Sequence, residues 1–218
     1  MAVQTSSLVL SMSLALYALH CAMHKVPLLW SIHRVHHSVE ALVLPAILHT
    51  HPIEDLLVGT WMAFVGGMVG GGTLYLTGVD SIHPTVIGIF AAYGTWEVIT
   101  GIFEHAHVPL SFGWLNRIFY GPVLHQIHHS AELRHRDKNL GNIFRLSIWD
   151  WMFGTLYLPE KNENYRWGLN DEEYGPSNPH LTVRDFYLEP IRRVWGIIQH
   201  RRRWLSFRAD AVNLRSRV

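Results

Sequence analysis

One short histidine pattern occurs twice in this 218-residue chain and limits what the chain can fold into. Residues 33–38 read HRVHHS and residues 125–130 read HQIHHS, so both follow H-x-x-H-H-S. On a helix, histidines at i, i+3 and i+4 fall within an arc of about 100°, and their three imidazoles share one face. The sequence therefore predicts two helical faces that are suited to binding metal.

The enrichment in histidine is local. Of 16 histidines, seven lie between His20 and His51 and six lie between His105 and His135. The single cysteine, Cys21, excludes an intramolecular disulfide and any cysteine-rich zinc or iron–sulfur site. Neutral imidazole is therefore the main ligand type available to a metal.

The composition favours a membrane protein, since 49% of the residues are hydrophobic and only 16% are charged. Three apolar stretches, at 6–21, 56–79 and 85–103, predict membrane-spanning helices. No small-residue cleavage pattern follows the first, so we interpret it as a retained helix rather than a signal peptide. In the second, glycines spaced as G-x-x-x-G predict close helix packing.

The formal net charge of +1 provides no field to attract a nucleic acid, and we expect no such partner.

Cations are placed asymmetrically around these stretches. The connection between the second and third stretches has no Lys or Arg, whereas seven cations lie beyond the other ends: Lys25, Arg34, Arg117, Arg134, Arg136, Lys138 and Arg145. By the positive-inside rule, both histidine patterns face the cytoplasm. The expected fold class is all-α, an integral membrane protein of about three transmembrane helices with a cytoplasmic, histidine-rich helical cap. We expect residues 161–218 to form a polar loop and an amphipathic basic helix lying on the anionic leaflet.

Further histidines extend the two patterns. His20 and His24, spaced i, i+4, also share a helical face, which gives eight histidines on three faces. That number exceeds the need of one mononuclear site and predicts two metal ions, for which a redox metal suits an all-histidine membrane site better than zinc. His105 and His107, spaced i, i+2, point to nearly opposite sides of a helix, so His105 is the stronger candidate.

Three acidic residues each allow two interpretations. Asp137 and Asp150 either orient ligand histidines or act as turn and cap residues, and Glu97 in the third stretch is either near the metal or a neutral structural carboxyl. The remaining six histidines are interpreted as structural: His49, His51, His83, His135, His180 and His200.

Two other function classes compete with a redox enzyme. A membrane metal- or haem-binding protein without oxygenase activity would need only two to four convergent histidines. A membrane zinc hydrolase should contain H-E-x-x-H, and the sequence has no such motif.

Several motifs occur together in a fixed order: H-x-x-x-H at 20–24, PLLW at 27–30, HRVHHS at 33–38, HPIE at 51–54, EHAHV at 104–108, HQIHH at 125–129, NLG at 139–141 and WDWMFGT at 149–155. With this order and spacing, residues 20–160 resemble the fatty acid hydroxylase and sterol desaturase superfamily. Its members tend to have more membrane helix ahead of the first histidine pair, so we expect this chain to be shortened at its start relative to them. They also often have Asn where His107 stands.

The resemblance implies that residues 1–160 form the membrane-embedded catalytic domain of a non-haem di-iron oxidoreductase. Such an enzyme uses two iron ions and O₂ to hydroxylate or desaturate a C–H bond of a membrane lipid, whether sterol, fatty acyl or isoprenoid/carotenoid. No haem or ferredoxin module is visible in the chain, so we expect the electron donor to be a separate protein, a reductase, ferredoxin or cytochrome. No catalytic residue is expected beyond the implied iron ligands: His20, His24, His33, His36, His37, His105, His107, His125, His128 and His129.

Overall fold

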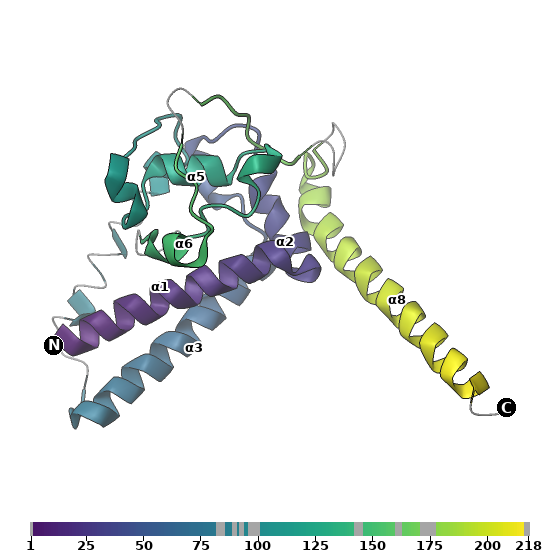
Figure 1. The fold of residues 1–218 in the computed structure, drawn as a ribbon, viewed down its shortest axis with the longest axis horizontal. Helices are drawn as coiled ribbons and strands as arrows, with labels where there is room; N and C mark the ends of the chain where they lie inside the picture. Colours follow the sequence, from purple (N-terminus) through teal and green to yellow (C-terminus); the bar gives the residue numbers. More distant parts are fainter. Residues whose placement is uncertain are drawn as a thin grey trace.

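The described residues fold into helices joined by irregular segments, as Figure 1 shows. The computed structural model describes residues 2–81, 86–88, 91, 94–95, 101–141, 146–159, 163–170 and 178–215, with side chains as far as residue 200. Their principal helices are α1 (Ala2–Lys25), α2 (Pro27–His37), η1 (Leu44–Leu48), α3 (Pro52–Thr77), η2 (Gly113–Arg117), α5 (Pro122–His128), η3 (Leu133–His135), α6 (Ile148–Phe153) and α8 (Val183–Arg215). Extended pairing in the described part is limited to two isolated bridges, so the predicted all-α class is confirmed.

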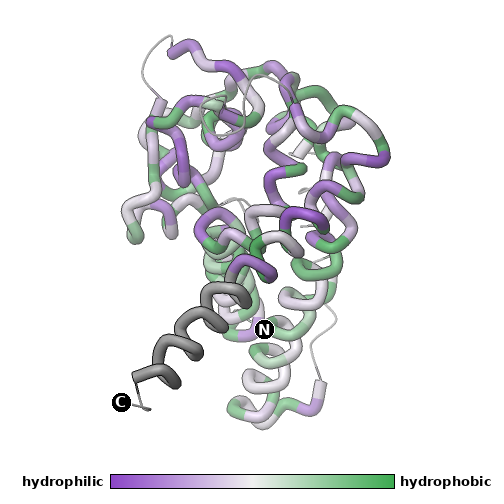
Figure 2. Tube along the Cα trace, turned by 90° about the vertical axis from the view of Figure 1, so that its right-hand side faces the viewer, coloured by the Kyte–Doolittle hydropathy of each residue, from purple (hydrophilic) through white to green (hydrophobic). Residues whose placement is uncertain are grey.

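Two helices, α1 and α3, are long and apolar enough to span a membrane. They pack side by side along much of their length, and Figure 2 shows hydrophobic residues along both. Only 6% of the apolar window of α3 is buried in protein. A core helix of a soluble protein would be covered, so this exposed apolar surface is suited to lipid. The third predicted span, 85–103, lies largely outside the described residues, as does Glu97.

The glycines of α3 contribute less to packing than the sequence suggested. A Cβ built at Gly66 would lie 3.7 Å from the Met12 side chain of α1, which is an ordinary contact distance. Gly67 and Gly71 have no such neighbour within 4 Å among the described residues. At Gly66, Gly67 and Gly71 the contact between α1 and α3 therefore does not require a glycine.

Proline and glycine set the ends of the helices that carry the histidines. Pro27, Pro52 and Pro122 occupy the first turns of α2, α3 and α5, where a missing N–H costs nothing. The side chain of His51 caps α3 by accepting a hydrogen bond from the Ile53 N–H at 3.2 Å. Each histidine pattern thus lies on a short helix with a defined start.

Residues 27–50, 105–141, 146–159 and 163–170 form a compact part above α1 and α3, which we call the cap (Figure 1). Its core is the inner face of α5, formed by Val123, Leu124 and Ile127 together with Tyr120. Four partly buried residues pack against this core: Leu156, Tyr157, Leu158 and Tyr165. Burial of the α5 core fixes the orientation of the second histidine pattern.

The last helix, α8, extends away from the cap at a large angle to α1 and α3 (Figure 1). The sequence predicted a helix in this region, and its first part packs against α2. The contact includes an ion pair from Arg34 Nη2 to Glu189 Oε1 at 2.9 Å. Farther along, Ile191 and Trp195 are 46% and 57% exposed, so an apolar surface of α8 remains uncovered by the described residues.

Candidate metal centre

Nine of the ten predicted site histidines gather in two clusters. Cluster one contains His20 and His24 from α1, His33 and His37 from α2, and His128 from α5. Its ring nitrogens, one from each residue, all lie within 4.8 Å of one another. The i, i+4 spacings on α1 and α2 place their paired imidazoles on one face, as the sequence predicted.

Cluster two contains His36 from α2, His105, and His125 and His129 from the second pattern. Its ligand atoms also lie within 4.8 Å of one another. The clusters adjoin, because the ring of His37 stacks on that of His129 with centroids 4.6 Å apart. Each H-x-x-H-H pattern therefore contributes to both clusters, and neither pattern forms a site alone.

Oxygen acceptors behind the rings fix how several histidines present their nitrogens. The Nδ1 atoms of His20 and His128 lie 2.7 and 2.9 Å from the carbonyl oxygens of Leu140 and Lys138. The Nδ1 of His105 lies 3.1 Å from the Gly101 carbonyl oxygen. Because a carbonyl oxygen only accepts, each Nδ1 carries the proton and each Nε2 carries a lone pair directed into its cluster.

Those lone pairs give a test of whether a metal fits. His20 Nε2 lies 3.1 Å from His33 Nε2, and the Nδ1 of His33 lies 2.7 Å from Glu54 Oε1. With both Nδ1 atoms protonated, two lone pairs face each other, and only a cation between them makes that arrangement favourable. Two nitrogens that bind one metal at about 2.1 Å and at right angles lie about 3 Å apart. The donor set therefore fits a metal ion.

Unpartnered nitrogens support the same conclusion. Among the described residues, His24 Nε2 and His128 Nε2 in cluster one are buried without a hydrogen-bond partner. A buried polar atom without a partner costs about 1–3 kcal/mol, so a native protein usually gives it a role. Metal coordination would satisfy both atoms.

Burial keeps these imidazoles neutral. Desolvation lowers the pKa of His33 and His36 to about 3, and neighbouring histidines add to the effect at His36. It also holds the pKa of His125 and His129 well below the usual value. Neutral imidazole is the form that binds metal, so the histidines outside the spans are ready as ligands at neutral pH.

The tenth predicted histidine, His107, lies outside both clusters. Its ring packs against Trp167 with centroids 4.9 Å apart, and its side chain is exposed. Of the histidines interpreted as structural, His51 caps α3 and His135 Nε2 contacts Glu163 Oε1 at 2.9 Å. His49, His180 and His200 also lie outside the clusters, and His83 lies outside the described residues.

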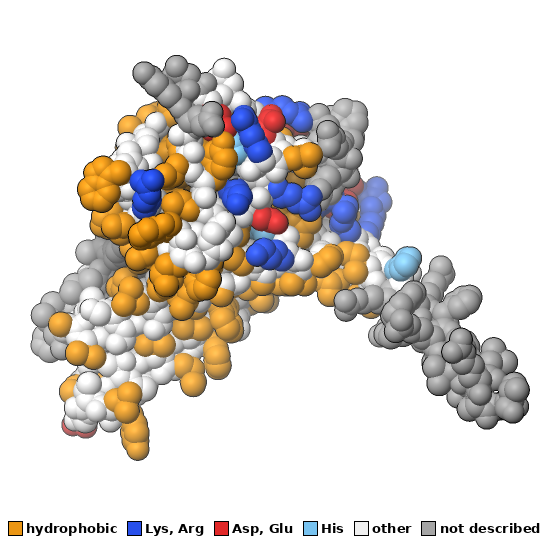
Figure 3. Space-filling model, in the orientation of Figure 1, with side chains coloured by type: hydrophobic (Ala, Val, Ile, Leu, Met, Phe, Trp, Pro, Cys, Tyr) orange, Lys and Arg blue, Asp and Glu red, His pale blue; other side chains and the backbone are white. Residues whose placement is uncertain are grey.

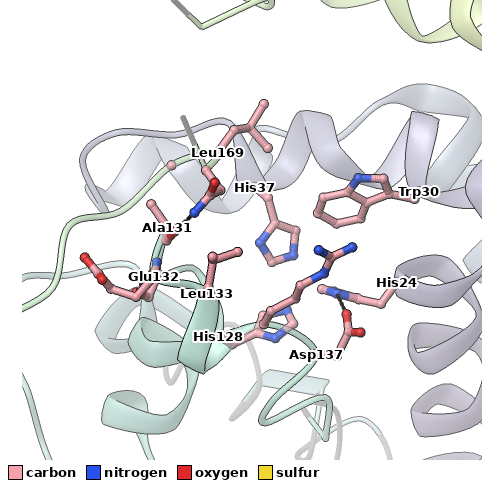
Figure 4. Close-up of a pocket in the computed structure, with 13 residues that line it drawn as sticks. His24, Trp30, His37, His128, Ala131, Glu132, Leu133, Asp137 and Leu169 are labelled. Atoms are coloured by element: carbon pink, nitrogen blue, oxygen red, sulfur yellow. Dashed lines mark hydrogen bonds and ion pairs between the residues drawn. The ribbon is translucent and has the colours of Figure 1, made fainter. Parts of the chain in front are cut away.

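A pocket opens onto cluster one from the surface of the cap (Figure 4). His24, His37 and His128 point into it, and Trp30 forms one wall. Its mouth is lined by residues of two loop segments, 130–137 and 168–170. Cluster one is therefore approached from outside the membrane helices.

The model of the family described as fatty acid hydroxylase matches residues 5–155, more than half of the chain. The chain belongs to the fatty acid hydroxylase family. The match covers all nine clustered histidines, and with the two candidate spans it indicates a membrane protein.

Relatives within the family have names that refer to lipids. Over 67% of its length the chain is 31% identical to ornithine lipid hydroxylase OlsE of Rhizobium tropici. It is 26% identical to alkylglycerol monooxygenase of Caenorhabditis elegans over 84% of its length, and 31% identical to methylsterol monooxygenase erg25B of Aspergillus fumigatus over 70%. The chain spans 39%, 31% and 47% of these three proteins. No solved structure gave a significant match.

Several supporting residues of this family member were missed or left open by the sequence. In the sequence, Glu54 stands out only as part of the HPIE motif. In the fold its Oε1 lies 2.7 Å from His33 Nδ1, so a residue of α3 orients a histidine of α2. Asp137 Oδ1 lies 3.4 Å from His24 Nδ1, which fits the orienting role. Asp150 touches no clustered histidine; it accepts from the Leu140 and Gly141 N–H groups at 2.7 Å each. Since the Leu140 carbonyl accepts from His20, Asp150 acts on the site through the backbone.

Proposed function

We propose that this chain carries the catalytic part of an O₂-dependent, non-haem di-iron oxidoreductase that hydroxylates or desaturates a C–H bond of a membrane lipid. The convergence of nine histidines into two adjoining, buried clusters carries the proposal. Each cluster would hold one iron: His20, His24, His33, His37 and His128 the first, and His36, His105, His125 and His129 the second.

An unactivated C–H bond is too weakly acidic for acid–base chemistry by side chains. Bound iron would supply the oxidising chemistry with O₂ that the side chains lack. The chain's own contribution is to hold neutral imidazoles in place, through Glu54 and the carbonyls of Leu140 and Lys138. The packed cap buries all four histidines of cluster two, and keeping bulk water from that cluster would protect reactive species from side reactions.

The lipid would enter from the bilayer around α1 and α3. The named relatives support a substrate drawn from amphipathic lipids with long alkyl or sterol bodies. We place the cap on the cytoplasmic side because Lys25, Arg134, Arg136 and Lys138 all lie on it or at its border. Residues 161–218 would then be an accessory segment in which α8 rests on the anionic leaflet, and electrons would come from a separate protein.

Metal analysis of the full chain, purified in detergent from iron-replete cells, tests the metal assignment. We expect about two irons per chain, and replacement of His36 by Ala should remove most of the iron from cluster two. His107→Ala is the matched control, because His107 lies outside both clusters, and it should retain the iron.

Lipid profiling tests the reaction. A strain lacking the gene, grown with oxygen, should accumulate one lipid class without its hydroxyl group or double bond, and the intact gene should restore it. Zinc as the only bound metal together with an unchanged lipid profile would refute the proposal. That result would favour a metal-binding protein without oxygenase activity.

A further inference from the structure

The pocket over cluster one is a suitable entry point for electrons. Trp30 is half-buried at its edge, and its ring centroid lies 5.1 Å from that of His24 and 5.4 Å from that of His37. Both histidines belong to cluster one. Trp30 therefore forms the pocket wall beside two proposed iron ligands, which reach the pocket themselves.

Four cations, one of which lines this pocket, lie in or directly beside the segments around it, and we call this region the rim. Lys25, at the end of α1, and Arg136, which lines the pocket, are exposed; Arg134 is 51% exposed and Lys138 is half-buried. The acidic groups in this region are Glu132, Asp137, which is engaged with His24, and Glu163, whose Oε1 lies 3.1 Å from Arg134 Nη2. Figure 3 shows several Lys and Arg side chains, with fewer Asp and Glu side chains among them, on the visible side of the cap. A positive surface of this kind attracts an acidic partner and orients it before contact.

These observations extend the proposed function, on which the inference rests. We infer that this rim is the docking surface for a small acidic one-electron carrier protein, which reduces cluster one by way of Trp30. In a hydroxylation, one O₂, two electrons and two protons convert C–H into C–OH and water. Two carrier molecules would each be oxidised by one electron per turnover.

Binding tests the docking surface without requiring turnover. The probe is an oxidised, acidic plant-type [2Fe–2S] ferredoxin, titrated calorimetrically into the full chain in detergent at low and at high salt. We expect binding that weakens with salt, and a dissociation constant raised about tenfold or more by the double variant Lys25→Glu/Arg136→Glu. The matched control is the double variant Arg117→Glu/Arg192→Glu, an equal charge change at exposed residues of η2 and α8 outside the pocket. It should leave the dissociation constant within about twofold of the original.

Two results would overturn the inference: no binding of the ferredoxin by the original chain, or equal weakening by the rim and control variants. A chain that binds the ferredoxin but lacks oxygenase activity would count against the proposed function alone.

The role of Trp30 is tested by stopped-flow reduction of the iron-loaded protein with reduced ferredoxin. Trp30→Leu should slow the reduction at least about tenfold without changing the dissociation constant, and an unchanged rate would place the electron path elsewhere.

Discussion

Glu54 lies 21 positions after His33 in the chain, yet its carboxylate accepts the Nδ1 proton of that ring at 2.7 Å. Both groups are buried, with side chains 8% and 3% exposed. This contact fixes the tautomer of His33 and turns its Nε2 toward His20 and His37. A single carboxylate on α3 therefore determines how α2 presents its first histidine.

Replacing Glu54 by Leu should lower the affinity of cluster one for iron by about 10- to 100-fold, as is usual for the loss of a group that orients a ligand. Glu54→Gln keeps an oxygen that can accept the hydrogen bond from His33 Nδ1, so its loss of iron affinity should be smaller. Iron content after dialysis against a graded chelator measures the difference. Equal iron retention by the two variants and the original chain would show that Glu54 has no orienting role.

The buried histidines should make the stability of the metal-free protein depend on pH. The pKa of His33 and His36 is about 3 in the fold, whereas an unfolded histidine titrates near 6.5. As pH falls below about 6.5, the unfolded chain takes up protons before the folded chain does, so the free energy of unfolding decreases. Each such histidine lowers it by up to about 1.4 kcal/mol per pH unit, until pH nears about 3.

Thermal melts of the metal-free protein in detergent at pH 7.5 and pH 5 measure this effect. We expect a clearly lower melting temperature at pH 5 and little change between pH 7 and pH 8. A melting temperature that does not fall at pH 5 would mean that the clusters are open to water in the absence of metal.

At the scale of elements, the segment after α5 acts as a support for the site. Asp150 in α6 holds the N–H groups of Leu140 and Gly141, and the Thr155 hydroxyl donates to the same carboxylate at 2.7 Å. The Leu140 carbonyl then accepts from His20 of α1. The NLG and WDWMFGT motifs thus act together, because one provides the carbonyl and the other holds it in place.

Gly141→Ala should disrupt this support. A Cβ at this position would lie 2.6 Å from Asp150 Oδ2 and 2.7 Å from the Leu146 carbonyl oxygen, so backbone or carboxylate must shift. We expect a loss of about 1–3 kcal/mol in stability and a weaker cluster one, measured by thermal unfolding and iron content. Gly72→Ala is the control, since no described atom lies within 4 Å of its Cβ. Equal behaviour of the two variants would contradict the supporting role of this segment.

For the molecule as a whole, α8 is tied to the helix that carries the first histidine pattern. Arg34 is almost fully buried and forms an ion pair with Glu189 of α8. A second contact joins the same two parts of the chain, because the Asn178 side chain donates a hydrogen bond to the Ser38 carbonyl at 2.6 Å. Arg34 lies directly beside His33 in the chain. A displacement of α8 would therefore act on α2 and on both clusters.

Glu189→Gln should destabilise the protein by about 2–4 kcal/mol, because it leaves the buried Arg34 without its carboxylate partner. The double variant Arg34→Met/Glu189→Gln should recover part of this loss, since the uncompensated charge is removed as well. A thermodynamic cycle built from thermal melts of the two single variants and the double variant measures the coupling. Additive losses would show that the ion pair does not link α2 to α8.

Much of the site could be predicted from the sequence. The i, i+3 and i+4 spacings of histidine require convergent imidazoles on any helix, and the apolar stretches around them require a lipid environment. Those two facts were sufficient for the all-α class and for eight of the clustered histidines, whereas His105 was the stronger candidate of a pair and joined the set through the family resemblance. The predicted third span and the cytoplasmic side of the cap stay predictions.

Only the tertiary structure decided how the histidines are divided. The sequence indicated two metal ions for these histidines, but the fold splits each pattern, so that His33 and His37 join cluster one while His36 joins cluster two. It also brought Glu54, Asp150 and Glu189 to their partners and left His107 against Trp167. Helical periodicity determines which side chains share a face, because it is a local property of the backbone. Contacts between residues 10 to 155 positions apart depend on how the segments pack, and no spacing in the sequence encodes that directly.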